Sequence, residues 1–286
     1  MRMSLDLDPA ALLSVAWRLA DIAVSAGQSI MEVYAKPGDV VLKNDGSPLT
    51  AADLAAEAVI AACLAKALPG IPVISEEAVL ATDGLGARGE TFVLVDPLDG
   101  TKEFIGRTGE FTVNIAIIAG GRPRAGVVYA PALARLWLGA LGAGAACAEV
   151  APCRHGVGDA ARQALRVRPR PEGGLIAVAS RSHLDPDTAA FLAGLEVNER
   201  RSIGSSLKFC LVAEGLADVY PRFGPTMEWD TAAGHAVLEA AGGRVTTPEG
   251  AAFGYGKAAT GYRNGGFVAW GGQPGKGQPR DSQPGG

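Results

Sequence analysis

The chain is organised around residues 92–104, which read Phe92-Val-Leu-Val-Asp96-Pro-Leu-Asp99-Gly100-Thr-Lys-Glu-Phe104. Four apolar residues at the start predict a buried strand. Proline cannot extend a sheet ladder, so we expect the chain to turn at residue 97 and a short helix to begin at the Gly-Thr pair. The predicted strand therefore ends in two carboxylates three residues apart.

This pair of acids has two possible explanations. Asp96 and Asp99, with the Leu98 carbonyl between them, would repel each other at a buried strand end unless a hard cation neutralised them. Oxygen ligands select magnesium, manganese or calcium, and the backbone N–H groups at the helix start can bind an anion. The motif then predicts a phosphate ester held on a metal. The alternative is an Asp-Pro turn followed by a helix cap.

Acidic residues also occur beside other predicted elements. Glu76 and Glu77 follow a short predicted strand at residues 71–74, and Asp230 precedes a predicted helix at 231–241. Carboxylates at the ends of neighbouring strands would converge at one edge of a sheet. Asp53 completes a capping box with Thr50 at the start of a helix predicted to reach residue 68, and Asp230 caps its own helix at least.

Composition limits the function classes. The chain has 286 residues, 48% of them hydrophobic, with 26 Lys and Arg against 30 Asp and Glu, so its formal charge is −4 and broad nucleic-acid binding is excluded. Four cysteines without a CxxC pair and only three histidines argue against a zinc site and indicate reduced thiols in a cytoplasm. Residues 10–26 are apolar but interrupted by charge, so we predict an amphipathic helix and no transmembrane segment.

The order of the predicted elements indicates an α/β (α+β) protein. Residues 111–118, 125–129 and 136–140 predict an antiparallel meander, and residues 175–179 open a second α/β unit. We place domains at 1–172 and 173–270, followed by a disordered Gly-rich tail at 271–286. Residues 84–89 match GxGxxG, but no strand precedes them, so we interpret them as a loop and not as a dinucleotide site.

Residues 203–208 read Ile-Gly-Ser-Ser-Leu-Lys and predict the end of a strand and the start of a helix. A helix N-terminus with two hydroxyls and a lysine can seat a phosphate. The same residues also suit an ordinary helix cap.

Together these motifs resemble the inositol monophosphatase superfamily of metal-dependent, lithium-inhibited phosphatases. The resemblance rests on Val95-Asp-Pro-Leu-Asp-Gly-Thr101, with Glu76-Glu77 upstream and Trp229-Asp230 downstream. Lys102-Glu103 and the motifs at 180–183, 204–210 and 220–225 are similar to the bacterial CysQ type, the 3'(2'),5'-bisphosphate nucleotidases. The resemblance covers about residues 10 to 270 and implies a layered αβαβα sandwich.

The resemblance also implies roles for individual residues. The implied ligands of two or three Mg²⁺ ions are Glu76, Asp96, the Leu98 carbonyl, Asp99 and Asp230. The implied catalytic residues are Asp53 and Thr101, as a pair that activates the attacking water, and Glu77, which orients water or metal. The implied substrate-binding residues are Glu76, Leu98, Asp99, Gly100, Thr101, His183, Gly204, Ser205, Lys208 and Asp230.

The implied reaction is hydrolysis of adenosine 3',5'-bisphosphate to AMP and phosphate in sulfate assimilation, with the sulfated precursor as a further substrate. One alternative is an inositol-1-phosphate or fructose-1,6-bisphosphate phosphatase, against which Lys102-Glu103 weighs. Another is a non-catalytic nucleotide sensor, which would be expected to have lost an acid of the site. A cytoplasmic monomer or homodimer is implied, with peripheral attachment to the inner membrane left open.

Overall fold

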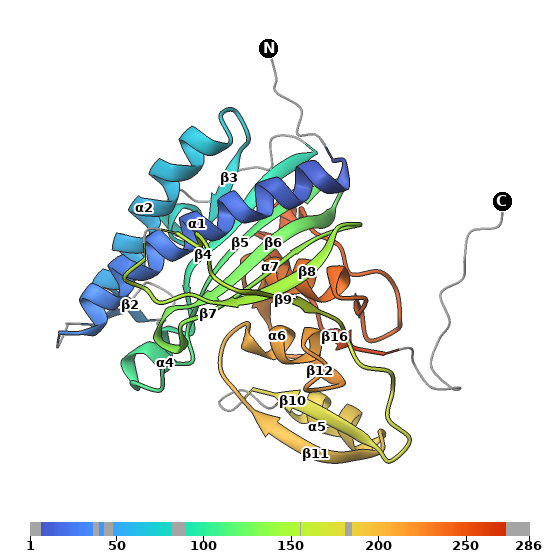
Figure 1. Cartoon of the computed structure of the whole chain (residues 1–286). Helices are drawn as coiled ribbons and strands as arrows, with labels where there is room; N and C mark the ends of the chain where they lie inside the picture. Colours follow the sequence, from blue (N-terminus) through green and yellow to red (C-terminus); the bar gives the residue numbers. More distant parts are fainter. Residues whose placement is uncertain are drawn as a thin grey trace.

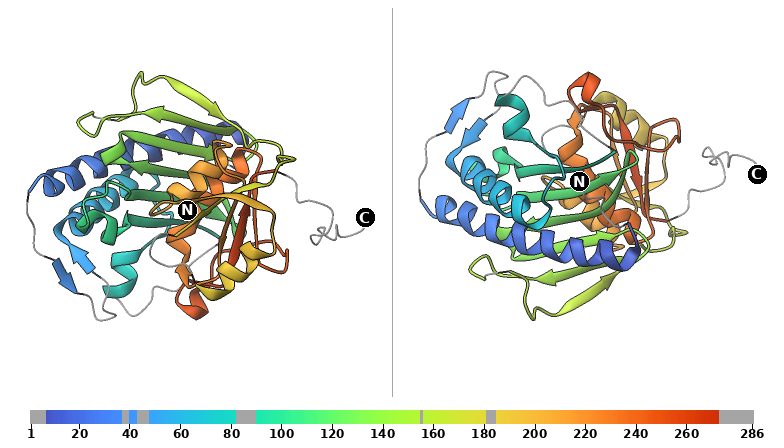
Figure 2. Two further views of the ribbon diagram at one scale, coloured as in Figure 1. Left: turned by 90° about the horizontal axis from the view of Figure 1, so that it is seen from below. Right: turned by 90° about the horizontal axis from the view of Figure 1, so that it is seen from above.

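Five layers of helix and sheet make up the molecule. The computed structural model describes residues 7–36, 40–42, 48–81, 90–154, 156–180 and 185–272. Helices α1 (Pro9–Tyr34) and α2 (Ala51–Ala67) cover one face of the first sheet. Helices α6 (Leu207–Ala213) and α7 (Glu228–Ala240) lie between the first sheet and a second one, and α5 (Pro186–Ala193) lies beyond the second sheet (Figures 1 and 2). The predicted αβαβα sandwich is confirmed.

The first sheet carries the central motif. Among the described residues it has seven strands in the order β3-β4-β5-β6-β7-β8-β9. The pairing of β3 with β4 is parallel and every later pairing is antiparallel, which confirms the predicted meander. Its strands are β3 (Val73–Ser75), β4 (Thr91–Asp99), β5 (Thr112–Ala119), β6 (Arg122–Ala130), β7 (Arg135–Ala140), β8 (Gly144–Glu149) and β9 (Arg162–Leu165).

The second sheet comes from the C-terminal part of the chain. Within the described ranges it has five strands in the order β11-β10-β12-β16-β14. These are β10 (Leu175–Ala179), β11 (Val197–Ser202), β12 (Val219–Arg222), β14 (Arg244–Thr246) and β16 (Phe267–Trp270). Shorter elements are β1 (Val40–Leu42), β2 (Pro48–Thr50), α3 (Glu76–Ala81), α4 (Thr101–Ile105), β13 (Thr226–Met227), β15 (Arg263–Asn264), η1 (Pro131–Leu133) and η2 (Ala258–Thr260).

Small residues bring α7 close to the first sheet. A Cβ at Gly126 on β6 would lie only 2.8 Å from both the Ala233 carbonyl oxygen and the Ala236 Cβ of α7. A side chain at this position would push the helix outward. Because the N-terminal turn of α7 carries Asp230, this close packing places a C-terminal acid against strands of the N-terminal sheet.

Helix α1 is the one described helix that is long and apolar enough to cross a membrane by length and composition. However, 56% of its most apolar window is buried inside the molecule, where Leu19, Ala23 and Ile30 belong to the core beside the first sheet. Its apolar face is thus used in packing, as the amphipathic prediction expected.

Two predicted boundaries were wrong. Strand β4 does not end before Pro97: its pairing with β5 is interrupted between Asp96 and Asp99 and resumes where Asp99 meets Thr112. The irregularity accommodates the proline, which lacks a ladder donor. Helix α7 begins at Glu228, three residues earlier than predicted. The predicted loop at 84–89, the motif at 181–183 and the tail from 273 lie outside the described residues.

Candidate active site

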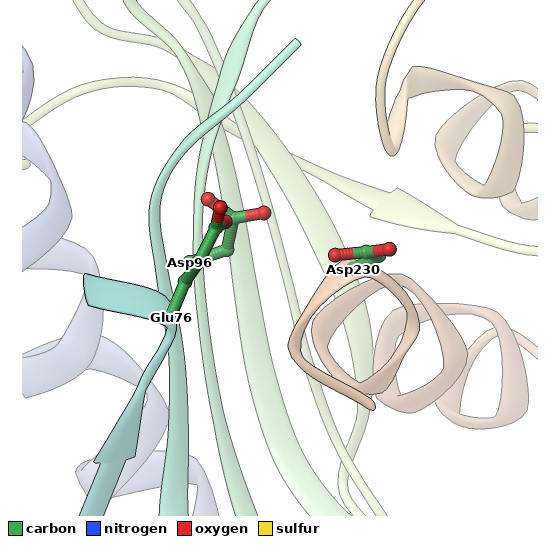
Figure 3. Close-up of side chains that lie close together, drawn as sticks. All are labelled: Glu76, Asp96 and Asp230. Carbon is green, nitrogen blue, oxygen red and sulfur yellow. The ribbon is translucent and has the colours of Figure 1, made fainter. Parts of the chain in front are cut away.

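Three acids from distant parts of the sequence meet at one point. Glu76 is the first residue of α3, directly after β3, Asp96 lies on β4, and Asp230 lies in the first turn of α7. One carboxylate oxygen from each lies within 4.8 Å of the others. Figure 3 shows Glu76 and Asp96 side by side, with Asp230 facing them from the helix.

The cluster is electrostatically unfavourable by itself. Burial, and then the charges of Glu76 and Asp99, raise the pKa of Asp96 well above its usual value. Burial, and then the charge of Asp99, raise the pKa of Asp230 in the same way. These groups lower their energy either by taking up protons or by binding a cation.

The donor atoms fit a hard divalent cation. All three converging groups are carboxylates, and oxygen ligands at this spacing suit Mg²⁺, Mn²⁺ or Ca²⁺ better than a soft metal. A bound cation would also remove the repulsion that raises the two aspartate pKa values. The residues present therefore fit the predicted metal.

Asp99 lies next to this cluster and is held from the other side. Its Oδ2 accepts hydrogen bonds from the Ser205 hydroxyl (2.7 Å), the Ser206 N–H (2.8 Å) and the Ser206 hydroxyl (3.0 Å). The Asn114 amide also donates to it at 3.3 Å. These contacts join the end of β4 in the first sheet to the start of helix α6, which lies between the two sheets.

The predicted activating pair lies close to the acids. Thr101 is the first residue of α4, and its hydroxyl donates to the Leu98 carbonyl oxygen at 3.3 Å. Asp53 is 2% exposed, and its Oδ2 accepts from the Thr50 N–H at 2.8 Å and the Thr50 hydroxyl at 2.6 Å, which confirms the capping box. The charge of Asp53 also contributes to the raised pKa of Asp96.

A glycine is required where β4 turns into α4. Gly100 has φ +90°, in the left-handed region, and a Cβ there would lie 3.2 Å from the Glu110 carbonyl oxygen and 3.3 Å from the Ser205 Cβ. A larger residue would be strained and would press on the loop that holds Asp99.

The acids open into a cavity of about 230 Å³ that also contains cationic groups. Lys208 is 4% exposed, and its ammonium donates to the carbonyl oxygens of Ser205 (2.6 Å) and Ile203 (3.3 Å). Burial lowers the pKa of Lys208 to about 8, while the nearby Asp99 charge opposes this change. Lys208 thus positions the loop that carries Ser205 and also faces the cavity.

The sequence analysis missed several residues that line this cavity, including Ser206, Thr231 and the cationic Arg222. Arg222 ends β12 and lines the same cavity as Lys208 and Asp230. One Nη donates to the Pro225 carbonyl oxygen at 3.3 Å, but its Nε is buried without a hydrogen-bond partner in the described structure. The available signal was its place in the motif at 220–225, because arginine commonly binds phosphate.

Most of the predicted site residues line the cavity, and the others lie elsewhere. Glu76, Asp99, Gly100, Thr101, Ser205, Lys208 and Asp230 line the cavity. Gly204 is not part of the cavity lining, but its N–H donates to the Glu110 carboxylate at 2.9 Å, and the Leu98 side chain is buried in the core. Glu77 follows Glu76 in the first turn of α3, and His183 lies outside the described residues.

The layered fold places an oxygen-only acid cluster beside a cavity with cationic groups, an arrangement that suits a hard divalent cation and an anionic ligand. Residues 11–270 match the model of the inositol monophosphatase family. The chain belongs to this family, whose enzymes use Mg²⁺.

Curated relatives are similar over most of the chain. The 3'(2'),5'-bisphosphate nucleotidase CysQ of Escherichia coli O157:H7 is 49% identical over 231 residues, which cover 80% of this chain and 88% of the relative. The nucleotidase of the same name from Salmonella typhimurium is 48% identical over 241 residues, covering 83% and 92%.

Solved structures agree with the fold. The crystal structure of CysQ from Bacteroides thetaiotaomicron superposes with a TM-score of 0.75 at 40% identity, covering 91% of this chain and 98% of that one. An inositol monophosphatase from Anabaena has a TM-score of 0.68 at 26% identity, covering 92% of each chain.

Proposed function

We propose that this chain is a Mg²⁺-dependent 3'(2'),5'-bisphosphate nucleotidase that hydrolyses adenosine 3',5'-bisphosphate to AMP and phosphate. One observation carries the proposal: a single cavity is lined both by the acids Glu76, Asp99 and Asp230 and by the cations Lys208 and Arg222. A substrate with two phosphate groups matches such a cavity, because one phosphate can lie at the acids through metal ions while the other meets cationic side chains directly. The names of the relatives, at up to 49% identity, support the same activity.

Glu76, Asp96, the Leu98 carbonyl, Asp99 and Asp230 are the proposed ligands of two or three Mg²⁺ ions. When bound, Mg²⁺ neutralises phosphate oxygens and acidifies water. Four carboxylates balance two divalent cations before the substrate arrives. The convergence of Glu76, Asp96 and Asp230 supports this assignment.

Protein groups supply the remaining chemistry. Thr101 and Asp53 are the proposed pair that takes a proton from the attacking water, and Glu77 is proposed to orient it. The Thr101 hydroxyl already lies at hydrogen-bond distance from the Leu98 carbonyl, at the end of the strand that carries Asp96. The N–H groups of Gly100 and Thr101 are proposed to hold the reacting phosphate.

Arg222 and Lys208 are proposed to bind the second phosphate, with Gly204, Ser205 and His183 on the nucleotide side. The buried Arg222 Nε has no hydrogen-bond partner among the described residues, which is costly, and a phosphate oxygen would satisfy it. This assignment distinguishes the nucleotidase from an inositol-1-phosphate phosphatase, whose substrate carries a single phosphate.

The test compares two substrates that differ by one phosphate. Arg222→Met should reduce kcat/KM for adenosine 3',5'-bisphosphate by about 10- to 100-fold, the value of a charge-assisted hydrogen bond of about 1.5 to 3 kcal/mol. The same substitution should change kcat/KM for adenosine 3'-monophosphate little, because this substrate has no second phosphate. Arg201→Met, on the exposed edge strand β11, is the matched control.

Phosphate release from inositol-1-phosphate and fructose-1,6-bisphosphate, measured in parallel, completes the comparison. Equal rates on all substrates, or an equal loss on both adenosine substrates in Arg222→Met, would contradict the nucleotidase assignment. No phosphate release from any of them would favour the non-catalytic sensor.

The domain division at residue 172, a cytoplasmic location and a monomeric or homodimeric state remain predictions. The domain division agrees with the membership of the two sheets, since β9 ends at Leu165 and β10 begins at Leu175. The packing of α1 in the core gives no support to membrane attachment.

A further inference from the structure

The first turn of α7, which carries Asp230, is held by a separate segment of the chain. The Glu228 carboxylate is fully buried and accepts the N–H groups of Gly256 and Lys257, each at 2.8 Å. The Asn264 amide donates to the Met227 carbonyl oxygen at 2.8 Å. Residues 255–264 therefore clamp the start of the helix.

Thr231 is the point where this clamp reaches the cavity. It follows Asp230 directly and lines the cavity. Its hydroxyl oxygen accepts from the Asn264 amide at 3.1 Å and from the Tyr255 hydroxyl at 3.3 Å, and it donates to the Glu228 carbonyl oxygen at 3.2 Å. With two donors and one acceptor around it, the Thr231 hydroxyl is held in one orientation.

The Tyr255 hydroxyl is shared with a buried histidine. His235 Nδ1 lies 2.9 Å from this hydroxyl, and the ring is 1% exposed. On the other side of the ring, Nε2 lies 3.2 Å from Glu239 Oε1, and Glu239 also pairs with Arg122 of β6 at 3.4 Å. The other charges near Tyr255 are those of Glu228 and Lys257, which pair with each other at 3.3 Å.

A tyrosine hydroxyl has a single proton, so it cannot donate to both neighbours. If Nδ1 carries the ring proton, the ring donates to Tyr255 and the tyrosine proton is directed to Thr231. If Nδ1 carries no proton, the Tyr255 hydroxyl donates to the ring instead, and Thr231 no longer receives a hydrogen bond from Tyr255. Whether the His235 ring carries a proton on Nδ1 therefore decides whether the Thr231 hydroxyl receives its hydrogen bond from Tyr255.

We propose that Tyr255, oriented by His235, is a positioning residue that fixes Thr231 and thereby the first turn of α7, so that Asp230 is held where it binds metal. This inference rests on Asp230 being a metal ligand, as in the proposed function. It adds a chain of buried side chains that runs from Glu239 and His235 on α7 through Tyr255 to Thr231 at the cavity.

The first test is calorimetric titration of the whole protein with Mg²⁺ alone. Tyr255→Phe should weaken Mg²⁺ binding by about 3- to 10-fold, below the effect of removing a direct partner of a metal ligand. The matched control is Tyr129→Phe, which also removes a buried tyrosine hydroxyl, one that donates to the Val150 carbonyl oxygen at 2.9 Å in the other core. Equal Mg²⁺ affinity in Tyr255→Phe and the wild type would overturn the proposal, as would an equal loss in both variants.

Thr231→Val provides a second route if Tyr255→Phe folds poorly. It removes the hydroxyl but keeps the shape, and it should weaken Mg²⁺ binding at least as much as Tyr255→Phe. Thermal unfolding of each variant without metal establishes that the compared proteins are folded. Unchanged Mg²⁺ affinity in Thr231→Val would overturn the proposal independently.

A double-mutant cycle tests whether His235 acts through Tyr255. His235→Leu should weaken Mg²⁺ binding about as much as Tyr255→Phe, and the double variant should be no weaker than either single one, because groups that act as a unit are not additive. Additive losses would show two independent structural effects and contradict the chain.

The ring itself gives a spectroscopic signature, since the sequence has only three histidines. Mg²⁺ should shift the ¹⁵N signal of His235 Nδ1 in the wild type and in Tyr129→Phe, but much less in Tyr255→Phe. These measurements use no substrate, so a failed nucleotidase assay leaves them intact. A His235 signal that responds equally in all three proteins would count against the proposal.

Discussion

Replacing Asp96 by asparagine should make the metal-free protein more stable while it removes activity. The side chain is buried, and its Oδ1 accepts the Leu98 N–H at 3.0 Å, a bond that an asparagine oxygen can also make. The substitution therefore changes the charge of the cluster with little change in shape.

The magnitude follows from the geometry. The ligand oxygens lie no more than 4.8 Å apart, and two unit charges at that distance repel by about 3.5 kcal/mol at an effective dielectric constant of about 20. Partial protonation already relieves part of this repulsion, since the pKa values of Asp96 and Asp230 are raised. We expect a gain of about 1 to 3 kcal/mol in the free energy of unfolding, or about 2 to 8 °C in Tm.

The assay is thermal unfolding with a chelator and with Mg²⁺. Wild-type Tm should rise with Mg²⁺, because a ligand that binds only the folded state stabilises it by about 2.7 kcal/mol at a hundred times its Kd. Asp96→Asn should start from a higher Tm, gain less from Mg²⁺ and release no phosphate. A lower Tm than wild type in chelator, or an equal Mg²⁺-dependent gain, would refute the idea that these acids repel each other until a cation binds.

The pH dependence of the stability of the metal-free protein should also reveal the repulsion within the acid cluster. A carboxyl group whose pKa is raised in the folded state binds more protons there than in the unfolded state, so its contribution destabilises the metal-free fold as pH rises through the folded pKa. Without metal, the wild type should therefore lose stability relative to Asp96→Asn as pH increases above the usual aspartate range.

Two further substitutions separate function from local structure. Asp53→Asn should reduce phosphate release by more than about 100-fold and lower the free energy of unfolding by about 1 kcal/mol. Thr50→Val should lower the free energy of unfolding by a similar amount but keep most of the activity. Equal losses of activity in both variants would show that Asp53 acts only as a helix cap. The pKa of Lys208 is lowered from an ordinary 10.5 to about 8 in the folded protein. Between about pH 8 and pH 10.5 the unfolded state therefore binds more protons than the folded state, so the free energy of unfolding should rise with pH over this range. Urea unfolding at about pH 7 and about pH 9.5 should show that rise in the wild type and not in Lys208→Met, and an equal pH dependence in the two proteins would contradict it.

Local sequence patterns marked the acids of the candidate site before the structure brought three of them together. Asp96 and Asp99 flank a proline after an apolar run, and Glu76 follows a short strand, so the sequence indicated which acids lie on or next to strands. The capping role of Asp53 also followed from its spacing to Thr50. Pro97 was misjudged because a bulged strand can pass through a proline when the partner strand compensates, and a single strand's sequence does not contain its partner.

By itself, the sequence determined the elements, the order of the meander, the acids that follow strands or open helices, and the family. The tertiary structure decided which of these groups lie together. Helix α7 packs closely on the first sheet where Gly126 has no side chain, and this packing brings Asp230 to Asp96. Arg222 faces the same acids from the second sheet, and Tyr255 reaches Thr231 from a loop. These pairings depend on how the layers stack, and stacking is set by packing across the whole core rather than by any local pattern.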